Sequence, residues 1–212
     1  MWIDCHCHTK FSYDNWLEPL NLVRRAKALG LDGIVVTEHY SYEASEPVEE
    51  IARGEGLLAL RGVEIATDMG HLLAYGVYDD SWNLWGRDTW LPMLGVIDSV
   101  RSLGGICVPA HPFRAIGACS LMERLLDLGG IAGVETHNGA NSDSDNGLAF
   151  DACLNLALPS LGGSDCHKVS AVGRCATEFL QPVSDMESFV AAVRAGACRG
   201  GYFAAYGKEQ RA

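Results

Sequence analysis

The chain has no hydrophobic run that approaches the roughly 18 residues needed to cross a membrane. Its first residues contain no apolar segment typical of a signal peptide, because Asp4 and neighbouring potential metal ligands interrupt them. Basic residues are few: 16 lysines and arginines stand against 27 aspartates and glutamates, a net charge of −11. These absences predict a cytoplasmic protein with no membrane partner. They disfavour broad electrostatic binding to nucleic acid, although a nucleic-acid end could still enter a pocket made positive by metal ions.

The eight cysteines include no pair at CxxC spacing. A chain of this length without a secretion signal does not need a disulfide framework, so we expect reduced thiols. Cys107, Cys153 and Cys175 lie in apolar surroundings and are expected to pack as small apolar residues. No GxGxxG pattern follows the first predicted strand, which leaves a dinucleotide-binding fold without support.

Short apolar runs alternate along the chain with amphipathic stretches that end in glycine. The run 32–39 is typical of a buried strand, and 16–30 has helical spacing with Gly30 as a candidate C-cap. The same reasoning predicts further strands at 57–65, 71–77, 106–111, 131–139, 159–167 (with its exit loop) and 176–182, and the stretch 198–206 closes the chain. It predicts further helices at 46–56, 91–105, 120–130, 145–157 and 184–196, the last with Ser184 as its N-cap.

This alternation indicates βα units and a mostly parallel sheet. About six or seven units in a chain of 212 residues fit a small α/β barrel better than an open sheet. We therefore expect a single domain over residues 1–212, in which 205–212 form a flexible tail.

Most of the seven histidines fall at or near the ends of predicted strands, and acidic residues lie beside several of them. In a parallel barrel the strand ends of one face surround one site, so residues far apart in sequence would converge there. A lone histidine at a strand end is more often structural, and an HxH pair alone is a weak indicator of metal. Six histidines and three acidic residues at the ends of separate strands are much harder to explain by chance. The histidines of the chain are His6, His8, His39, His71, His111, His137 and His167, and the acidic residues beside them are Asp14, Glu38, Glu64 and Asp165.

The stretch DCHCHT at 4–9 at first suggests a small zinc finger with cysteine and histidine ligands. On an extended segment, however, residues i and i+2 share a face. His6 and His8 would then point one way, and Cys5 and Cys7 the other. The later stretch GSDCH separates Asp165 and His167 from Cys166 in the same way. Nitrogen and oxygen ligands suit Zn²⁺, Mn²⁺ or Fe²⁺, and a shared carboxylate suits a multinuclear site.

Other residues have more than one interpretation. His137 and its neighbour Asn138 could each line the pocket, and Asp4 could orient a ligand histidine or act only at the start of the strand. Three tryptophans in the predicted loop 78–90 could stack on a base or ring, or pack as a lid or in a dimer contact. They are Trp82, Trp85 and Trp90. The oligomeric state stays open.

Taken together, the motifs resemble those of the PHP family, named for polymerase and histidinol phosphatase. The resemblance runs from Asp4 to about Thr177. Its motifs are DCHCHT, FSYD, VTEH, GVE, GHLLAYG, AHPFR and GSDCH, and VGRCAT resembles the segment after the last of them. One departure is Glu38, where the family commonly has aspartate before the histidine.

The resemblance implies a distorted (β/α)7 barrel that holds two or three divalent ions of zinc, manganese or iron. It implies a first site with His6, His8, Glu64 and Asp165. A second would share Glu64 and add His71 and His111. A third would use Asp14, His39 and His167.

Divalent cations would offset the repulsion between an anionic nucleophile and a phosphoester, so the expected reaction is attack of metal-bound hydroxide on phosphorus. Glu64, Asp165 and Arg114 are the expected catalytic residues, and Arg114 lies three residues after His111. Arg114 could bind phosphate bidentately, or form only a surface salt bridge. Lys168 and Arg174 are further substrate-binding candidates, although solvated charge is the simpler interpretation of both.

The expected function is a metal-dependent phosphatase or phosphodiesterase acting on a small phosphorylated metabolite or nucleotide. Two alternatives remain: an exonuclease acting on single-stranded RNA or DNA ends, and a non-catalytic metal-binding structural module. The negative charge weighs against the first, and the complete ligand set weighs against the second.

Overall fold

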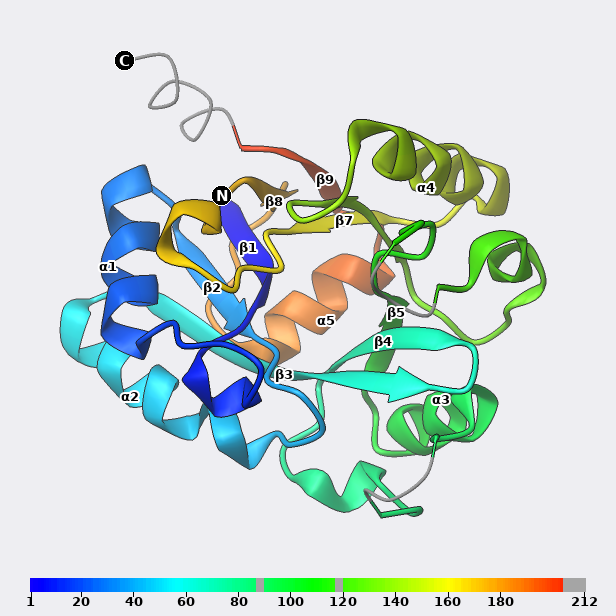
Figure 1. Ribbon diagram of the computed structural model, residues 1–212, viewed down its shortest axis with the longest axis horizontal. Helices are drawn as coiled ribbons and strands as arrows, with labels where there is room; N and C mark the ends of the chain where they lie inside the picture. The colour runs from blue at the N-terminus through cyan, green and yellow to red at the C-terminus, as the bar shows by residue number, and fades with distance from the viewer. Residues whose placement is uncertain (87–89, 117–119, 204–212) are drawn as a thin grey trace.

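The computed structural model describes residues 1–86, 90–116 and 120–203 (Figure 1). The expected tail, 205–212, lies outside these ranges. The α-helices of the described part are α1 (Pro19–Leu29), α2 (Glu46–Glu55), α3 (Met93–Ser102), α4 (Asp143–Leu156) and α5 (Met186–Arg194). Its strands are β1 (Trp2–Cys7), β2 (Gly33–Val36), β3 (Leu58–Thr67), β4 (Gly70–Tyr75), β5 (Ile106–Pro109), β6 (Val134–Asn138), β7 (Ser160–Gly163), β8 (Cys175–Phe179) and β9 (Cys198–Tyr202). Short 3₁₀ helices are η1 (Lys10–Ser12), η2 (Glu43–Ser45), η3 (Asp80–Trp82), η4 (Met122–Asp127) and η5 (Val169–Ala171).

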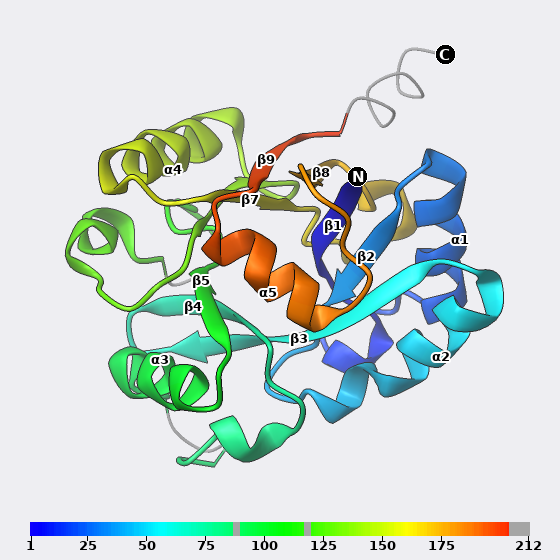
Figure 2. The ribbon, with the colours of Figure 1, turned by 180° about the vertical axis from the view of Figure 1, so that it is seen from behind.

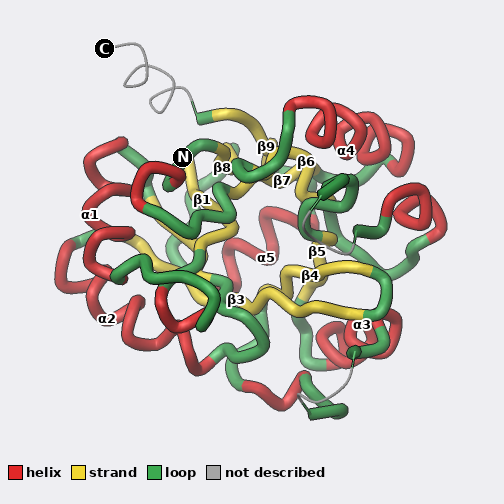
Figure 3. The backbone as a smooth tube through the Cα atoms, in the orientation of Figure 1, coloured by secondary structure: helices red, strands yellow, loops and turns green. Residues whose placement is uncertain are grey.

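A curled sheet in the order β5-β4-β3-β2-β1-β8-β9 forms an incomplete barrel, and β6 and β7 form a second, two-stranded sheet (Figures 1 and 3). The second sheet helps to close the curve, because Ala132 donates to Cys107 at β5 and Asp165 donates to His6 at β1. An α/β fold of distorted barrel shape is therefore present.

The expectation of a mostly parallel sheet is wrong. Within the described residues, β1–β2, β2–β3 and β6–β7 are parallel, whereas β1–β8, β3–β4, β4–β5 and β8–β9 are antiparallel. The connection from β3 to β4 has only two residues between the strands, which is too short for the crossover that a parallel pair requires. The regular (β/α)7 count is not confirmed by this arrangement.

Helix α5 lies across the curled sheet, in front of the strands in Figure 2. Its Phe189, Val190 and Val193 belong to a buried cluster that includes Ile3 and Tyr75 from the strands. Helices α1 and α2 cover another side of the sheet, where a second buried cluster forms. The strands are therefore held from both sides, which leaves their ends to carry polar side chains.

Two helix predictions need correction. The expected helix 120–130 is only the short 3₁₀ helix η4, because Met122 has a left-handed φ of 53° and its N–H is held by the carbonyl of Pro112. The N-cap of α5 is Asp185 rather than Ser184, since the Asp185 carboxylate accepts from the backbone of Ser188 at 2.8 Å. The predicted C-cap of α1 is correct: Gly30 has φ of 80° and donates to Ala26 and Lys27.

No helix in the described ranges combines the length and apolarity that a membrane span requires.

Candidate metal centre

Nine imidazole and carboxylate side chains converge at one end of the strands. Because β4 runs antiparallel to β3, the first residues of β4 lie beside the last residues of β3. His71 therefore meets Glu64 at the same edge as residues that follow β1, β2, β5 and β7. The converging residues are His6, His8, Asp14, His39, Glu64, His71, His111, Asp165 and His167.

The first group is fully buried and consists of His6, His8, Glu64 and Asp165. The Nε2 atoms of the two imidazoles lie 2.9 Å apart. The Oε2 atom of Glu64 lies 3.0 Å from Nε2 of His8 and 3.4 Å from Nε2 of His6. The Oδ1 atom of Asp165 lies 3.5 and 3.6 Å from the same two nitrogens.

Glu64 also joins this group to a second one. Its other oxygen, Oε1, lies 3.0 Å from Nδ1 of His71 and 3.0 Å from Nε2 of His111. A single carboxylate therefore faces two sets of imidazoles, one through each oxygen. This is the arrangement expected of a bridging ligand.

The third group is more open to solvent. Oδ2 of Asp14 lies 3.1 Å from Nε2 of His39 and 3.3 Å from Nε2 of His167. His39 turns its Nδ1 toward Oε2 of Glu64 at 3.2 Å, so this group also contacts the central carboxylate. Asp14 and His167 are each more than one third exposed, which makes this side the entrance to the site.

These residues fit divalent cations. Within each group, one ligand atom per residue lies within 4.8 Å of the others. Ligand atoms held about 2.0–2.2 Å from a tetrahedral zinc ion would be roughly 3.3–3.6 Å apart, close to the spacings observed here. Two imidazole nitrogens cannot face each other at 2.9 Å without a proton or a cation between them. The nitrogen and oxygen donors suit Zn²⁺, Mn²⁺ or Fe²⁺.

Glu135 in β6 was missed by the sequence analysis and is central to the support of the ligands. Its Oε1 lies 2.8 Å from Nδ1 of His6, and its Oε2 accepts from the backbone N–H of His111 at 2.7 Å. A proton held on Nδ1 of His6 by this carboxylate leaves Nε2 with its lone pair toward the cluster. One acidic residue thus orients ligands from two groups.

A shift of register in β6, between Glu135 and His137, explains why strand alternation did not find this residue. Because of the shift, Glu135 and Asn138 both reach the site, although simple alternation would pair Glu135 with His137. Asn138 donates to Glu135 at 2.9 Å and to Asp165 at 3.3 Å. His137 instead bonds Thr136 and stacks edge-on with Phe150 and Tyr202, outside the three groups.

His8 is oriented by a chain of hydrogen bonds that runs through Ser12 to Glu38. The Ser12 hydroxyl donates to Glu38 and lies 2.9 Å from Nδ1 of His8. Because its proton is used on Glu38, the Ser12 oxygen accepts from Nδ1 of His8, which leaves Nε2 to face the cluster. Thr9 donates its backbone N–H and its hydroxyl to the same carboxylate. Glu38 therefore supports a ligand without entering the cluster.

Arg114 lies at the cluster and not on the open surface. Its guanidinium donates to Asp165, to Asn138 at 2.9 Å and to Asn141 at 2.7 Å. Asp165 is buried, and the contact is therefore not a surface salt bridge.

Lys168 and Arg174 are exposed beside the cluster. They line a hollow of about 600 Å³ together with Asp165 and His167. The guanidinium of Arg174 donates to the carbonyl of Gly139 at 2.9 Å, which orients it at the rim. Lys168 and Arg174 therefore lie near the entrance. Within the described residues, neither makes a hydrogen bond or an ion pair with the nine converging side chains.

Asp4 does not contact a ligand imidazole. Its carboxylate accepts backbone N–H groups of Ser164 at 2.7 Å and Gly173 at 3.0 Å, which ties β1 to the loops that follow β7. β7 can approach β1 this closely because Gly163 has no side chain: a Cβ there would lie 2.3 Å from Cβ of His6. This contact brings Asp165 next to His6.

The cysteines beside the ligands do not all share one face. Cys5 packs in the cluster under α5, whereas Cys7 packs with Cys166 in the cluster under α1 and α2. A register shift in β1 between Asp4 and Cys7 separates them. Both are buried and stay clear of the nine converging side chains.

The tryptophans of the expected stacking loop have different environments. Trp82 is fully buried, and Trp85 is partly buried against the same core. Trp90 is 68% exposed.

Burial and the charges inside the cluster shift several pKa values. Burial disfavours the charged forms of His6 and His8, but the surrounding carboxylates raise the pKa of both imidazoles, so without a cation these two hold protons that a bound cation would replace. Burial alone would raise the pKa of Glu64, but the charge of His6 and hydrogen bonds with the imidazoles hold it well below its usual value. Burial also opposes ionisation of Asp165, yet His6 and Arg114 keep its pKa low. Burial lowers the pKa of His39 and of His111. The carboxylates are thus kept ionised and those two imidazoles neutral.

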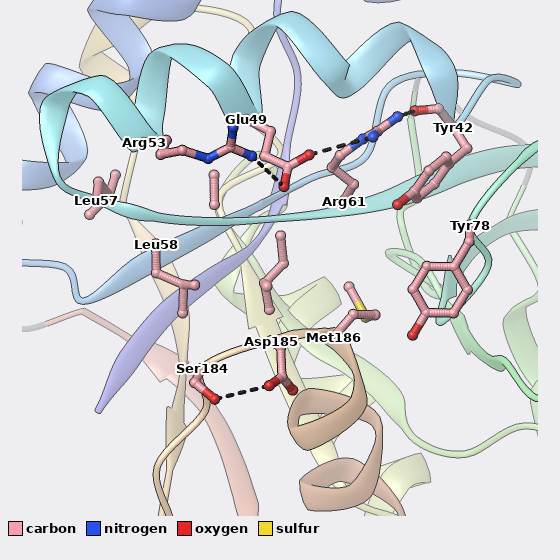
Figure 4. Close-up of a pocket in the computed structure, with 12 residues that line it drawn as sticks. Tyr42, Glu49, Arg53, Leu57, Leu58, Arg61, Tyr78, Ser184, Asp185 and Met186 are labelled. Atoms are coloured by element: carbon pink, nitrogen blue, oxygen red, sulfur yellow. Dashed lines mark hydrogen bonds and ion pairs between the residues drawn. The ribbon is translucent and has the colours of Figure 1, made fainter.

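A separate cavity of about 510 Å³ lies between α2, the start of β3 and the start of α5 (Figure 4). Its charged groups pair with one another: Arg61 and Arg53 both contact Glu49 at 3.4 Å, and Arg61 also stacks on Tyr42. None of the nine converging residues lines it. The ion pair between Arg61 of β3 and Glu49 of α2 links this helix to the sheet.

Two segments of the chain match models of a known family. Residues 4–94 match the model of the PHP domain, and residues 143–198 match a PHP-associated model. An uncharacterised protein of Methanocaldococcus jannaschii is 25% identical over 74% of this chain and 92% of its own length. A Thermotoga maritima protein named "Probable histidinol-phosphatase" is 33% identical over 31% of each chain.

Solved structures share the fold. A Chromobacterium violaceum amidohydrolase with bound sulfate and no metal has a TM-score of 0.68 and 18% identity, over 95% of this chain and 98% of its own. A lesion-specific endonuclease of Pyrococcus furiosus has a TM-score of 0.66 and 17% identity, over 94% of this chain and 57% of its own. A Bifidobacterium adolescentis protein, provisionally described as a metal-dependent phosphoesterase, has a TM-score of 0.63 and 21% identity, over 78% of this chain and 87% of its own.

Both family models include residues of the converging cluster, the first from His6 to His71 and the second Asp165 and His167. The chain therefore belongs to the PHP family.

Proposed function

We propose that this protein is a phosphatase or phosphodiesterase that hydrolyses phosphate esters of a small metabolite or nucleotide. The observation that carries the proposal is the placement of Glu64 between two groups of imidazoles, with a third group beside it. In this proposal the nine converging residues hold two or three divalent ions, and Glu64 is shared between two of them. The single-domain organisation over residues 1–212 is part of the same proposal.

Bound divalent cations would offset the negative charge of the phosphoryl group and lower the pKa of water at the site. The residues of the chain supply the rest. Glu135 and Ser12 hold the Nδ1 protons of His6 and His8, so that both imidazoles present Nε2 to the cluster. Asp165 and Glu64 provide fixed negative charge at the back of the site, where burial keeps bulk water out.

Arg114 is the residue placed to bind the phosphoryl group. Its Nε and one terminal nitrogen are used by Asn141, Asn138 and Asp165, which lock the guanidinium plane beside the cluster. In this proposal the other terminal nitrogen donates to a phosphoryl oxygen and stabilises charge that develops in the transition state. Lys168 and Arg174 would attract the anionic substrate to the hollow at the entrance.

The test is a panel of phosphomonoesters and phosphodiesters assayed with Mn²⁺, Zn²⁺ and Fe²⁺ separately. His8→Ala should lose most of the activity and at least one bound metal ion per chain. His137→Ala is the matched control, because this histidine lies outside the three groups, and it should keep both. Fewer than two divalent ions per chain in protein purified without chelator would contradict the metal assignment.

Two other outcomes would change the proposal. Faster turnover of a labelled single-stranded oligonucleotide than of any small ester would favour the exonuclease, for which the fold shared with the Pyrococcus furiosus endonuclease is the supporting observation. Binding of metal without hydrolysis of any phosphoester would favour a structural module. The net charge of −11 is the reason to place the small ester first.

A further inference from the structure

Two tyrosines flank His39 at the entrance of the metal centre. The ring centroid of Tyr13 lies 5.9 Å from that of His39, and the ring of Tyr40 lies 6.4 Å from it. Tyr13 directly precedes Asp14 in the chain, and Tyr40 directly follows His39. We call Tyr13 and Tyr40 the tyrosine wall.

Both residues of the tyrosine wall have left-handed backbone conformations, with φ of 52° at Tyr13 and 60° at Tyr40. Bulky residues seldom adopt this region, and such conformations concentrate at functional sites. At Tyr40 the conformation is held by a hydrogen bond from its N–H to the carbonyl of Glu64 at 3.0 Å. Tyr40 is therefore fixed to the same strand that carries the central carboxylate.

The two sides of the entrance differ in chemistry. On the His167 side, the hollow is lined by Lys168 and Arg174. On the His39 side, Tyr13 leaves 71% of its surface exposed and offers an aromatic face next to the third group. A ligand whose phosphoryl group occupies the centre would extend its other end over one of these two sides. A flat apolar ring suits the tyrosine wall, because stacked or edge-to-face contacts between aromatic rings are favourable.

We propose that Tyr13 and Tyr40 select phosphomonoesters whose leaving group carries a planar ring. This inference rests on the proposed phosphoesterase function and specifies its substrate class. In the reaction, water adds to phosphorus and the bond from phosphorus to the ester oxygen breaks. The products are a ring-bearing alcohol, which takes up the proton, and inorganic phosphate. No redox step is involved.

The test compares benzyl phosphate with cyclohexylmethyl phosphate. Both are esters of primary alcohols of similar size, so they differ mainly in whether the ring is planar and aromatic. The metal-loaded wild type should have a KM for benzyl phosphate about five to ten times lower than for the saturated ester, with similar kcat. Tyr13→Leu should remove most of this difference by raising KM for benzyl phosphate alone, and Tyr40→Leu should act in the same direction.

Two variants separate the ring contact from a general effect on folding. Tyr13→Phe keeps the ring and should keep the preference. Tyr78→Leu removes another exposed tyrosine, which lines the cavity of Figure 4 and lies outside the metal centre, and it should leave both KM values unchanged. Equal KM values for the two esters in the wild type would overturn the inference. So would a Tyr13→Leu variant that raises both KM values equally.

Binding of the non-hydrolysable benzylphosphonate and cyclohexylmethylphosphonate, measured by calorimetry, distinguishes this inference from the proposed function. Tighter binding of the benzyl compound that Tyr13→Leu abolishes, in the absence of any turnover, would support the tyrosine wall and reject the reaction. Turnover of both esters with equal phosphonate affinities would keep the reaction and reject the wall.

Discussion

Glu135 shows how a residue outside the cluster can determine the geometry within it. The carboxylate contacts Nδ1 of His6 and the backbone N–H of His111, and it also accepts from Asn138. Glutamine has a similar shape but replaces one acceptor oxygen with an amide donor. A donor placed against any of these three N–H groups would leave buried polar groups without partners.

We therefore expect Glu135→Gln to weaken metal affinity by roughly 10- to 100-fold and to destabilise the fold by about 1–3 kcal/mol. Titration with Zn²⁺ or Mn²⁺ and urea denaturation would measure the two effects. Glu123→Gln is the control, since Glu123 is exposed on η4. An unchanged metal affinity in Glu135→Gln would show that His6 does not need this partner.

His137 gives a prediction about pH. Burial lowers its pKa below the ordinary value of 6.5, so the unfolded chain takes up a proton more readily than the folded chain. His137 therefore costs no stability above pH 6.5 and destabilises the fold increasingly as the pH falls below it. His137→Phe keeps the ring against Phe150 and Tyr202 but cannot titrate. Its free energy of unfolding should fall less between pH 7 and 5 than that of the wild type, and parallel pH profiles would contradict this.

The sequence predicted which imidazole and carboxylate side chains would converge, but it did not predict every residue that hydrogen-bonds to them and orients them. Histidines and carboxylates at strand ends, together with the family motifs, indicated the nine converging positions. Alternation failed at the register shifts of β1 and β6, because an extra residue in a strand reverses the face of every later residue in that strand. Cys5 and Cys7 were therefore wrongly placed on one face. Glu135 was not singled out, although VETHN carries a glutamate within a buried strand.

The stability of helix α5 depends on the N-terminal cap of its first turn. Asp185 and Ser188 form a reciprocal capping box, whereas the Ser184 side chain donates to the Asp185 carboxylate and caps no backbone N–H of the first turn among the described residues. Loss of the cap leaves backbone N–H groups of the first turn without partners. We expect Asp185→Ala to lower Tm by about 2–4 °C, and Ser184→Ala to change it by less than about 1 °C. Thermal unfolding of the two variants would check this, and a larger loss in Ser184→Ala would reverse the assignment.

Most elements could be predicted from periodicity, and the exceptions have local causes. Helix α1 ends at Gly30 as expected, because a residue with φ of 80° favours glycine. The spacing of Leu121, Leu125 and Leu128 suits an α-helix, but the backbone at Met122 prevents one. Strand direction could not be read from apolar runs, since parallel and antiparallel partners bury similar residues.

For the whole molecule, bound cations should contribute to stability because the ligands come from both halves of the chain. A cation present at about 100 times its Kd would stabilise the fold by about 2.7 kcal/mol, or roughly 5–10 °C in Tm. Chelation should lower Tm by this amount, and added Mn²⁺ or Zn²⁺ should restore it. Glu64→Gln should reduce the shift, because Glu64 belongs to two groups. An identical Tm with and without chelator would contradict the prediction.

The place of β1 in the sheet has a consequence for biosynthesis. β1 pairs with β2 on one side and with β8 on the other, and the N-terminal amine itself bonds the carbonyl of Phe179. During synthesis, the edge of β1 that pairs with β8 therefore stays unpaired until residues more than 170 positions later have left the ribosome. The first group of ligands is likewise incomplete until Asp165 has left the ribosome. A nascent chain can thus display the HxH pair long before the first group of ligands is complete, so loading of that group should wait until Asp165 has emerged.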